Sequence, residues 1–170
     1  MTARYRVEPL GDHARAAFEC GEPALDAYFR ERVTQDVRRR LANCFVLVEV
    51  STGVIAGFYT IAAAGIPTPD LPSLLTRRLP RYPTLPAVRI GRLAVDRGHR
   101  GRGLGGAMIA DAATKAMAEP AAAFALLVDA KSDAAVAFYE HHGFERFESR
   151  PQTLFLPLAT AAKALAPRHR

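Results

Sequence analysis

The stretch Arg100-Gly101-Arg102-Gly103-Leu104-Gly105-Gly106 decides the fold of this 170-residue chain. It follows an apolar run over 88–95, typical of a strand, and leads into an alanine-rich run over 103–118, typical of a helix. Alternate glycines can adopt positive φ values and turn successive N–H groups into a concave surface, and the helix N-terminus adds its positive dipole end. The stretch therefore predicts a binding site for a pyrophosphate group.

An ordinary flexible glycine turn is the alternative interpretation of this stretch, because isolated glycine-rich strings are weak signals. Two known kinds of phosphate site are excluded. The stretch has no Gly-Lys-Ser/Thr ending, so it is not a P-loop, and no acidic residue about 20 positions later closes a second strand of a dinucleotide-binding fold. A phosphate site here would belong to another class.

Composition indicates a globular protein with a preference for polyanions. The apolar fraction is 49%, and 23 Lys and Arg against 17 Asp and Glu give a net charge of +6; such a surplus attracts nucleic acids and phosphate-bearing cofactors. Cys20 and Cys44 are too few for a disulfide scaffold or a cysteine zinc site, and we expect no metal site. Without a signal peptide or a membrane-spanning apolar stretch, the protein is expected to be cytoplasmic.

The first half of the chain predicts helices followed by a hairpin. We expect an extended start over 4–8, a helical piece over 12–20, and a longer helix that opens at Glu22 and Pro23. The stripe of this longer helix consists of Leu25, Phe29, Val33 and Val37 at i+4 spacing. Apolar runs over 44–50 and 54–64, joined by a short turn, predict an antiparallel hairpin.

Six of the twelve prolines lie between residues 65 and 86. They exclude a long helix or a central strand there, although 74–79 could form a short helix. So long an insertion is usually functional or disordered. Beyond it we expect strands over 88–95, 124–130, 144–148 and 153–158, and a helix capped by Ser132 that ends at Gly143. The order predicts an α/β fold (α+β type) with a mixed sheet: one domain over 1–158 and a fraying tail over 159–170.

Two motifs resemble those of the GCN5-related N-acetyltransferases, the GNAT superfamily. The first is Arg100 to Gly105; the second is a Phe-Tyr pair followed by Gly-Phe, in Ala137 to Phe144. The resemblance implies the GNAT fold, with a mixed, mostly antiparallel central sheet flanked by helices, and acetyl-CoA as cofactor. It implies that the pyrophosphate and the pantetheine arm are bound by the backbone of Leu93, Ala94, Val95, Arg100, Gly101, Arg102, Gly103, Leu104, Gly105 and Gly106.

Tyr139 is the candidate catalytic residue that this resemblance implies. A phenol beside the thioester can give a proton to the leaving thiolate as general acid. The alternative is a core aromatic, since Tyr139 is spaced i+3 from Val136 on an amphipathic helix. Asp96 and Glu49 are candidate bases, but an amine that is partly neutral at the working pH needs only water.

Further segments resemble the GNAT toxins of bacterial toxin-antitoxin modules. These are Cys20-Gly21-Glu22, Leu79-Pro80-Arg81-Tyr82-Pro83, Gly91 to Asp96, and Phe147-Glu148 before Pro151. The resemblance implies acetylation of the α-amino group of aminoacyl-tRNA, which blocks translation. It also implies a small ribbon-helix-helix antitoxin as partner and a homodimer.

Several arginines form a candidate path for the tRNA backbone, since guanidinium groups neutralise phosphates. The alternative for any one of them is a solvated surface charge. Two rival functions remain: a GNAT enzyme that acts on a protein N-terminus or a small amine, and a catalytically idle CoA- or nucleic-acid-binding module. The candidate tRNA residues are Arg77, Arg78, Arg81, Arg89, Arg92, Arg38, Arg39 and Arg40.

Overall fold

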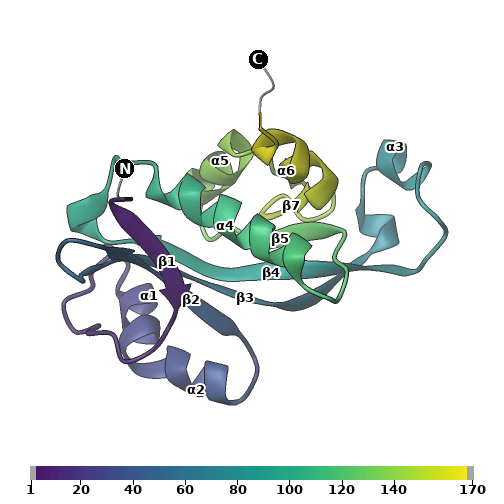
Figure 1. Cartoon of the computed structure of the whole chain (residues 1–170). Coiled ribbons are helices and arrows are strands. Elements are labelled where there is room, and N and C mark those ends of the chain that lie inside the picture. Colours follow the sequence, from purple (N-terminus) through teal and green to yellow (C-terminus); the bar gives the residue numbers. More distant parts are fainter. Residues whose placement is uncertain (1–2, 168–170) are drawn as a thin grey trace. The chain divides into compact units, whose positions relative to one another are not determined.

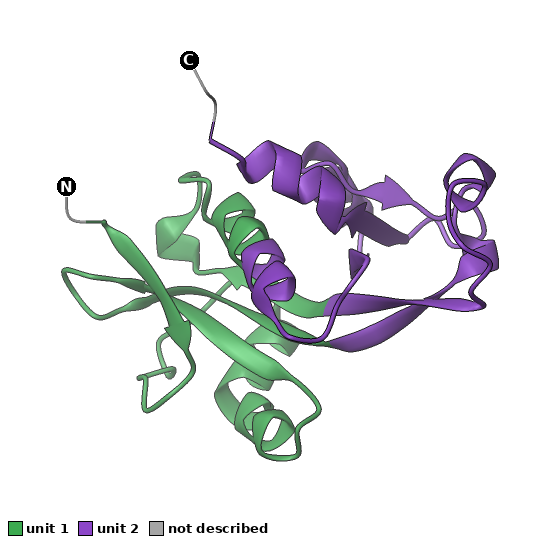
Figure 2. Cartoon of the chain, turned by 45° about the vertical axis from the view of Figure 1, so that its right-hand side comes forward, with its two compact units in different colours: residues 1–62, 90–111 green, residues 63–89, 112–170 purple. Residues whose placement is uncertain are grey.

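A computed structural model describes residues 3–167 of the chain. The chain divides into two compact units, each built from two separate segments (Figure 2). Unit 1 comprises residues 1–62 and 90–111, and unit 2 comprises residues 63–89 and 112–170. Strands β3 and β4 and helix α4 each contribute to both units.

Unit 1 contains the N-terminal helices, the hairpin and the glycine-rich loop (Figure 1). Its elements are β1 (Tyr5–Pro9), α1 (Pro23–Ala27), the π-helical turn η1 (Tyr28–Arg32), α2 (Val33–Arg38), β2 (Asn43–Glu49), most of β3 (Ile55–Pro67), the end of β4 (Thr84–Val95), the 3-10 turn η3 (Arg97–His99) and the start of α4 (Leu104–Ala118). β1 pairs with β2 and β2 with β3, both antiparallel.

The predicted longer helix is confirmed as one helical run over 23–38, with a π turn in its middle. Its apolar stripe faces the sheet: Phe29 and Val33 are fully buried, and the Phe29 ring stacks on Phe58 of β3 with centroids 4.1 Å apart. Val46 and Val48 of β2 point into the same core. Burial of this stripe holds the helices against the hairpin.

Helix α4 packs on the other face of the unit 1 sheet. Tyr59, the neighbour of Phe58 on β3, points to this face, and its hydroxyl donates a hydrogen bond to Asp111 of α4. Gly57 allows the close packing here, because an added Cβ would lie 2.9 Å from the carbonyl oxygen of Ala94 and 3.0 Å from Met108. The alternation of Phe58 and Tyr59 thus places helices on both faces (Figure 1).

The predicted helix over 12–20 is wrong: the segment is irregular apart from a turn at 16–17. Side chains from the long helical run bind its backbone instead, and Arg30 donates to the carbonyl of Phe18. Arg15 reaches back and donates to the carbonyl of Phe29 at 2.7 Å and to Thr34 at 3.1 Å. The bond from Arg30 satisfies a carbonyl that a local helix would otherwise pair, and the bonds from Arg15 fix the segment against the helical run.

Unit 2 holds the proline-rich insertion and the C-terminal elements. Its remaining elements are η2 (Thr68–Asp70), α3 (Ser73–Thr76), β5 (Ala125–Asp129), α5 (Asp133–His141), β6 (Glu145–Arg146), β7 (Thr153–Pro157) and α6 (Leu158–Leu165). β7 pairs antiparallel with β5 and with β6. The predicted cap is confirmed, since Ser132 accepts a hydrogen bond at 3.1 Å from the N–H of Ala135.

The insertion is shorter and more regular than the prolines predicted. β3 continues to Pro67 and β4 begins at Thr84, so the irregular part covers 68–83. The prolines are compatible with these longer strands because Pro67 is the last residue of β3 and Pro83 directly precedes β4. At these positions the missing N–H does not remove a hydrogen bond between strands. Pro86 lies inside β4 but still accepts a hydrogen bond from Phe124 at 2.8 Å. The short helix spans Ser73–Thr76 rather than 74–79.

Two C-terminal expectations also change. The strand predicted over 144–148 is limited to Glu145–Arg146, because Phe144 and Phe147 on either side turn into the core. The tail predicted to fray from residue 159 forms helix α6, whose Leu158 and Ala161 are buried. Burial of this face stabilises a helix too short to persist alone. Residues 168–170 of the predicted tail lie outside the described part.

The seven strands are hydrogen-bonded in the order β1-β2-β3-β4-β5-β7-β6. The predicted α/β class with a mostly antiparallel sheet is confirmed. Within residues 3–167, none of the helices has the length and apolar content needed to cross a membrane.

Candidate functional site

The glycine-rich loop of unit 1 has the backbone that its sequence predicts. Gly101 and Gly103 have φ values of +75° and +73°, and both face open space where a Cβ would stand. Leu104 then begins α4, whose first N–H groups have no partner within the helix. Left-handed glycines before a helix N-terminus form an anion-binding backbone, so the loop fits a pyrophosphate.

Two arginine side chains of this loop hold it in place. Arg100 donates a hydrogen bond to the carbonyl of Cys20, next to Gly21. Arg102 donates to the hydroxyl of Tyr5 at 2.7 Å, and this hydroxyl also lies 3.0 Å from Nδ1 of His99. The two guanidinium groups thus tether the loop to β1 and to the segment before α1.

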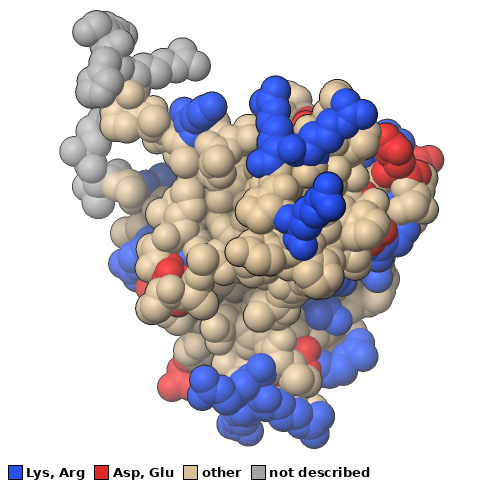
Figure 3. Space-filling model, turned by 90° about the vertical axis from the view of Figure 1, so that its right-hand side faces the viewer, with Lys and Arg blue, Asp and Glu red and all other residues tan. Residues whose placement is uncertain are grey.

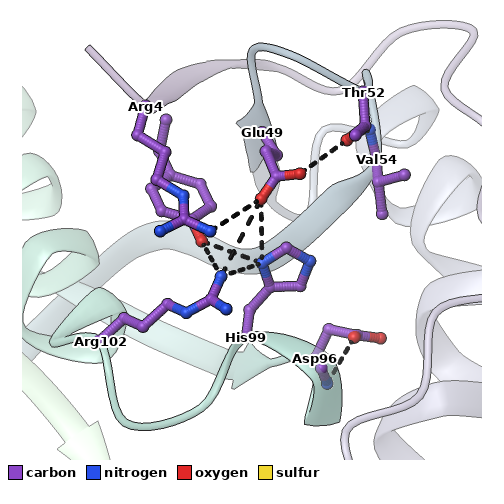
Figure 4. A network of polar contacts seen from close by, with 9 residues as sticks. Arg4, Glu49, Thr52, Val54, Asp96, His99 and Arg102 are labelled. Atoms are coloured by element: carbon purple, nitrogen blue, oxygen red, sulfur yellow. Dashed lines mark hydrogen bonds and ion pairs between the residues drawn. The ribbon is translucent and has the colours of Figure 1, made fainter.

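Glu49 lies in the same network, which Figure 4 shows from close by. Its Oε2 is 3.6 Å from Arg4, 3.7 Å from His99 and 4.0 Å from Arg102, and its Oε1 accepts a hydrogen bond from Thr52 at 3.0 Å. The carboxylate is largely buried among these partners. Glu49 therefore holds the side chains of Arg4 and Arg102 beside the loop. A carboxylate engaged in this way is a poor candidate for a general base.

Asp96, the other candidate base, links backbone segments. Its Oδ2 accepts a hydrogen bond from the N–H of Gly98 at 2.9 Å and its Oδ1 accepts one from the N–H of Glu19 at 3.0 Å. The first bond caps η3 and the second fixes the segment before α1. Both carboxylate oxygens are engaged, so Asp96 acts as a structural cap.

The backbone predicted to pair with the pantetheine arm lies at the end of β4. Ala94 is buried, while Leu93 and Val95 are partly buried. The N–H of Asp96 donates to the carbonyl of Ala56 at 2.8 Å, which pairs this end of the strand with β3. Leu93 to Val95 and the loop over 100–106 therefore belong to the same unit. Pairing with pantetheine stays a prediction.

Tyr139 lies on α5 in unit 2. Its side chain is buried between Phe138 and Phe144, with ring centroids 5.1 and 5.2 Å away. Burial raises the pKa of its phenol from the ordinary value of about 10 to about 12, so the hydroxyl is protonated at neutral pH and stays so well into the alkaline range. Tyr139 is therefore packed as a core aromatic and also holds a proton, and the two interpretations made from the sequence are compatible.

The proline-rich insertion is anchored within unit 2. Leu71 is buried and Leu75 and Leu79 are partly buried against a core that includes Phe147 and Phe155. Arg150 donates to Asp70 at 2.8 Å and ties η2 to the segment before β7. The insertion is therefore an ordered surface element.

The eight candidate tRNA arginines fall into two groups. Arg89 forms an ion pair with Asp129 at 2.5 Å, and the guanidinium of Arg92 lies 3.5 Å from the centroid of the Tyr28 ring. Among residues 3–167, by contrast, no carboxylate pairs with the side chains of Arg77, Arg78, Arg81, Arg38, Arg39 and Arg40. Figure 3 shows several groups of basic side chains on the face that it presents. The arginines without a carboxylate partner are the better candidates for binding phosphates, because their charge is not compensated within the described part of the chain.

Sequence reasoning missed three residues that shape these regions. Tyr5 and His99 orient Arg102, and Tyr82 is exposed in the insertion beside unpaired arginines. A tyrosine in the Leu-Pro-Arg-Tyr-Pro string is a signal that could have found Tyr82. No sequence signal links Tyr5 to the loop 94 residues later.

No group of three or more His, Cys, Asp or Glu side chains within residues 3–167 has the arrangement of a metal site. Cys20 and Cys44 are free and buried, and burial raises the pKa of their thiols to about 11 and about 12. Neither thiol is suited to nucleophilic chemistry.

Comparison with known proteins places these regions in one family. The model of the acetyltransferase (GNAT) family matches residues 8–144. The chain is 36% identical over 151 residues to the tRNA-acetylating toxin of Mycobacterium tuberculosis, with 88% of each chain covered. It is 30% identical over 169 residues to the probable toxin TacT of Sinorhizobium fredii, with 93% of each covered.

Comparison with solved structures agrees with this assignment to the GNAT family. AtaT complexed with acetyl-methionyl-tRNAfMet superposes with a TM-score of 0.85 at 25% identity, covering 95% of this chain and 99% of that one. AtaTR bound with AcCoA gives a TM-score of 0.80 at 25% identity, covering 96% and 99%. The resemblance to GNAT toxins that the sequence motifs predicted is confirmed, and the chain belongs to the acetyltransferase (GNAT) family.

Proposed function

We propose that this protein transfers the acetyl group of acetyl-CoA to the α-amino group of aminoacyl-tRNA and acts as the toxin of a toxin-antitoxin pair. The observation that carries the proposal is the loop with two left-handed glycines, Gly101 and Gly103, at the start of α4. The names of the relatives supply the substrate class: one is a tRNA-acetylating toxin, and AtaT was solved with acetyl-methionyl-tRNAfMet.

The residues present fit acetyl-CoA. The open space at Gly101 and Gly103 lets a diphosphate approach the backbone, and the N-terminus of α4 favours its negative charge. Leu93, Ala94 and Val95 would bind the pantetheine amides through their backbone. The bound cofactor supplies an activated acetyl thioester. The tethers from Arg100 and Arg102 keep the loop in its binding conformation before the cofactor arrives.

Tyr139 would serve as the general acid. Its phenol carries a proton at neutral pH, as an ordinary tyrosine does, and burial raises its pKa further, to about 12. Phe138 and Phe144 pack against the ring and fix its direction. In the proposed step, the amine nitrogen would bond to the acetyl carbon as the carbon–sulfur bond of the thioester breaks. The phenolic O–H of Tyr139 would donate its proton to the leaving thiolate and regain one from water.

We propose that neither Asp96 nor Glu49 acts as general base. The oxygens of Asp96 accept backbone hydrogen bonds and Glu49 is enclosed by cations, so neither is free to take a proton from an incoming amine. An amine that is partly neutral at the working pH loses its proton to water.

The unpaired arginines would bind the phosphate backbone of tRNA. Arg77, Arg78 and Arg81 lie in an ordered insertion, and Arg38 to Arg40 lie at the end of the long helical run. Arg89 and Arg92 would contribute less, because each already has an internal partner. Contacts of this kind are independent of base sequence, so they select a polyanion rather than one tRNA species.

The proposed partners follow from the proposed role as a toxin. We expect a small ribbon-helix-helix antitoxin that neutralises the enzyme by binding it, a homodimeric assembly, and action in the cytoplasm, where charged tRNA is found. The net charge of +6 offers an acidic antitoxin segment an electrostatic target.

The test is mass analysis of total aminoacyl-tRNA after incubation with the purified protein and acetyl-CoA. We expect N-acetylated aminoacyl ends, and far fewer of them after the same incubation time when Tyr139→Phe replaces the parent protein. Acetylation of protein N-termini or of polyamines, with aminoacyl-tRNA unchanged, would establish the first rival function. Cofactor binding without acetyl transfer to any amine would establish the idle module.

A further inference from the structure

An open pocket of about 510 Å³ lies in the proline-rich insertion, entirely within unit 2. Its lining includes Thr68, Pro69, Arg77, Pro80, Arg81 and Tyr82. The volume falls within the ~300–1,000 Å³ range of small-ligand sites. The combination of guanidinium groups with an aromatic ring and proline rings suits a ligand that is anionic at one end and flat at the other.

The frame of this pocket is fixed by hydrogen bonds. The N–H of Thr68 donates to the carbonyl of Pro83 at 3.0 Å, and the hydroxyl of Thr68 donates to the carbonyl of Tyr82. These bonds hold the backbone of Tyr82, although the residue as a whole is 61% exposed. An exposed aromatic on an anchored backbone offers a π face at little cost in backbone entropy.

The charges of this pocket are uncompensated. Three other arginines of unit 2 pair with carboxylates: Arg89 with Asp129, Arg146 with Glu140 and Arg150 with Asp70. Arg77 and Arg81 pair with no carboxylate of residues 3–167. A positive pocket without an internal counter-ion favours a phosphate-bearing ligand.

We propose that this pocket binds one unpaired nucleotide of the tRNA 3′ end, with the base stacked on Tyr82 and the flanking phosphate between Arg77 and Arg81. This inference rests on the proposed function and adds a recognition element to it. An unpaired base can splay out and stack on an aromatic ring, whereas the bases of a duplex are covered on both faces by their neighbours. The pocket would therefore recognise the single-stranded end of the tRNA rather than its helical stem.

The experiment compares deacylated tRNA with the same tRNA trimmed of its single-stranded 3′ end, each titrated against the parent and variants. We expect Tyr82→Ala to weaken binding of the intact tRNA by between about fivefold and about 150-fold, the range for loss of one stacked base, and to leave binding of the trimmed tRNA unchanged. Tyr82→Phe should bind both like the parent, because stacking needs the ring and not the hydroxyl. Arg77→Ala with Arg81→Ala should lower the salt dependence of binding to intact tRNA.

Leu74→Ala is the matched control, because Leu74 is 75% exposed on the same insertion but does not line the pocket; it should bind both tRNAs like the parent. Equal binding of the two tRNAs by the parent, or equal weakening of both by Tyr82→Ala, would overturn the proposal. So would a Tyr82→Ala protein that binds both tRNAs normally but loses a protein antitoxin. Acetylation of aminoacyl-tRNA by the parent is measured separately, so failure of the pocket and failure of the proposed function are distinguishable.

Discussion

The guanidinium of Arg100 donates a hydrogen bond to the backbone carbonyl of Cys20, 80 residues earlier in the chain. This bond connects the Cys20-Gly21-Glu22 segment to the glycine-rich loop. Gly21 makes it possible: φ there is +98°, and a Cβ would lie 2.7 Å from Nη2 of Arg100. The glycine before α1 and the arginine of the loop are therefore parts of one structural unit.

Gly21→Ala should release this tether. The new Cβ displaces the end of the Arg100 side chain, and the left-handed backbone costs about 1–2 kcal/mol for a residue with a Cβ. We expect faster hydrogen exchange of the amides over 98–104, measured by mass spectrometry. Gly53→Ala is the control, since φ is +72° with no atom within 4 Å of a Cβ; it has a similar backbone cost without the loss of the tether. Equal loop exchange in the two variants would contradict this account.

Gly103→Val should abolish most of the affinity for acetyl-CoA. Gly103 has a φ of +73°, which a β-branched residue adopts poorly, and a side chain would enter the space that the pyrophosphate needs. Calorimetric titration gives the affinity and thermal unfolding reports the fold. Gly53→Val, with nearly the same φ outside the loop, should keep its affinity. A folded Gly103→Val protein that binds acetyl-CoA like the parent would show that the pyrophosphate lies elsewhere.

Tyr139→Phe should slow acetyl transfer by roughly a hundredfold or more, the usual contribution of a positioned general acid. Folding and acetyl-CoA affinity should remain, because the ring still packs between Phe138 and Phe144. The measurement is a single-turnover rate. Tyr28→Phe is the control: the pKa of Tyr28 is also raised to about 12 by burial, but its hydroxyl donates to Asp36. An unimpaired Tyr139→Phe rate would exclude this tyrosine from the chemistry.

The triple variant Arg77→Ala, Arg78→Ala, Arg81→Ala should bind tRNA more weakly and with a flatter salt dependence. Each lost phosphate contact removes about 0.7–0.9 from the slope of log affinity against log salt. Acetyl-CoA affinity should not change. The control removes three other exposed cations of unit 2, by replacing Lys131, Arg146 and Lys163 with Ala. If both triples lower the slope equally, net charge alone explains the binding and the insertion has no special part.

Stability should fall in alkali. Unfolded tyrosines lose their protons near pH 10, whereas burial raises the pKa of Tyr28 and Tyr139 to about 12. The folded state therefore holds these protons more tightly, and the stabilisation is complete below pH 10 and is lost as the pH rises from about 10 to about 12. Urea midpoints between pH 8 and about pH 11 measure this trend. A doubly substituted Tyr28→Phe, Tyr139→Phe protein should show a shallower decline, and an identical decline would assign the effect to other groups.

The sequence by itself determined the elements whose signals are local. The i+4 stripe of Leu25, Phe29, Val33 and Val37 predicted the helical run over 23–38, and Ser132 predicted the start of α5. The loop over 100–106 was predicted with its left-handed glycines, because φ preference belongs to the residue itself. Hydrophobic periodicity, helix caps and glycine positions depend only on residues that are close together in the sequence.

Only the tertiary structure decided the conformation of segments, and the roles of side chains, for which long-range partners compete with local preference. The segment over 12–20 is irregular because Arg15 and Arg30 bond across to distant backbone. Helix α6 persists because Leu158 and Ala161 are buried. Asp96 and Glu49 are candidate bases because they carry carboxylates, but their hydrogen-bond and ion-pair partners in the folded protein give them structural roles. The candidate tRNA arginines cannot be told apart by sequence, but their partners differ in the folded protein. Asp129 pairs with Arg89 and the Tyr28 ring contacts Arg92, whereas the arginines of the insertion pair with no carboxylate of residues 3–167. Which side chain meets which depends on the folded path of the chain, and no local pattern encodes it.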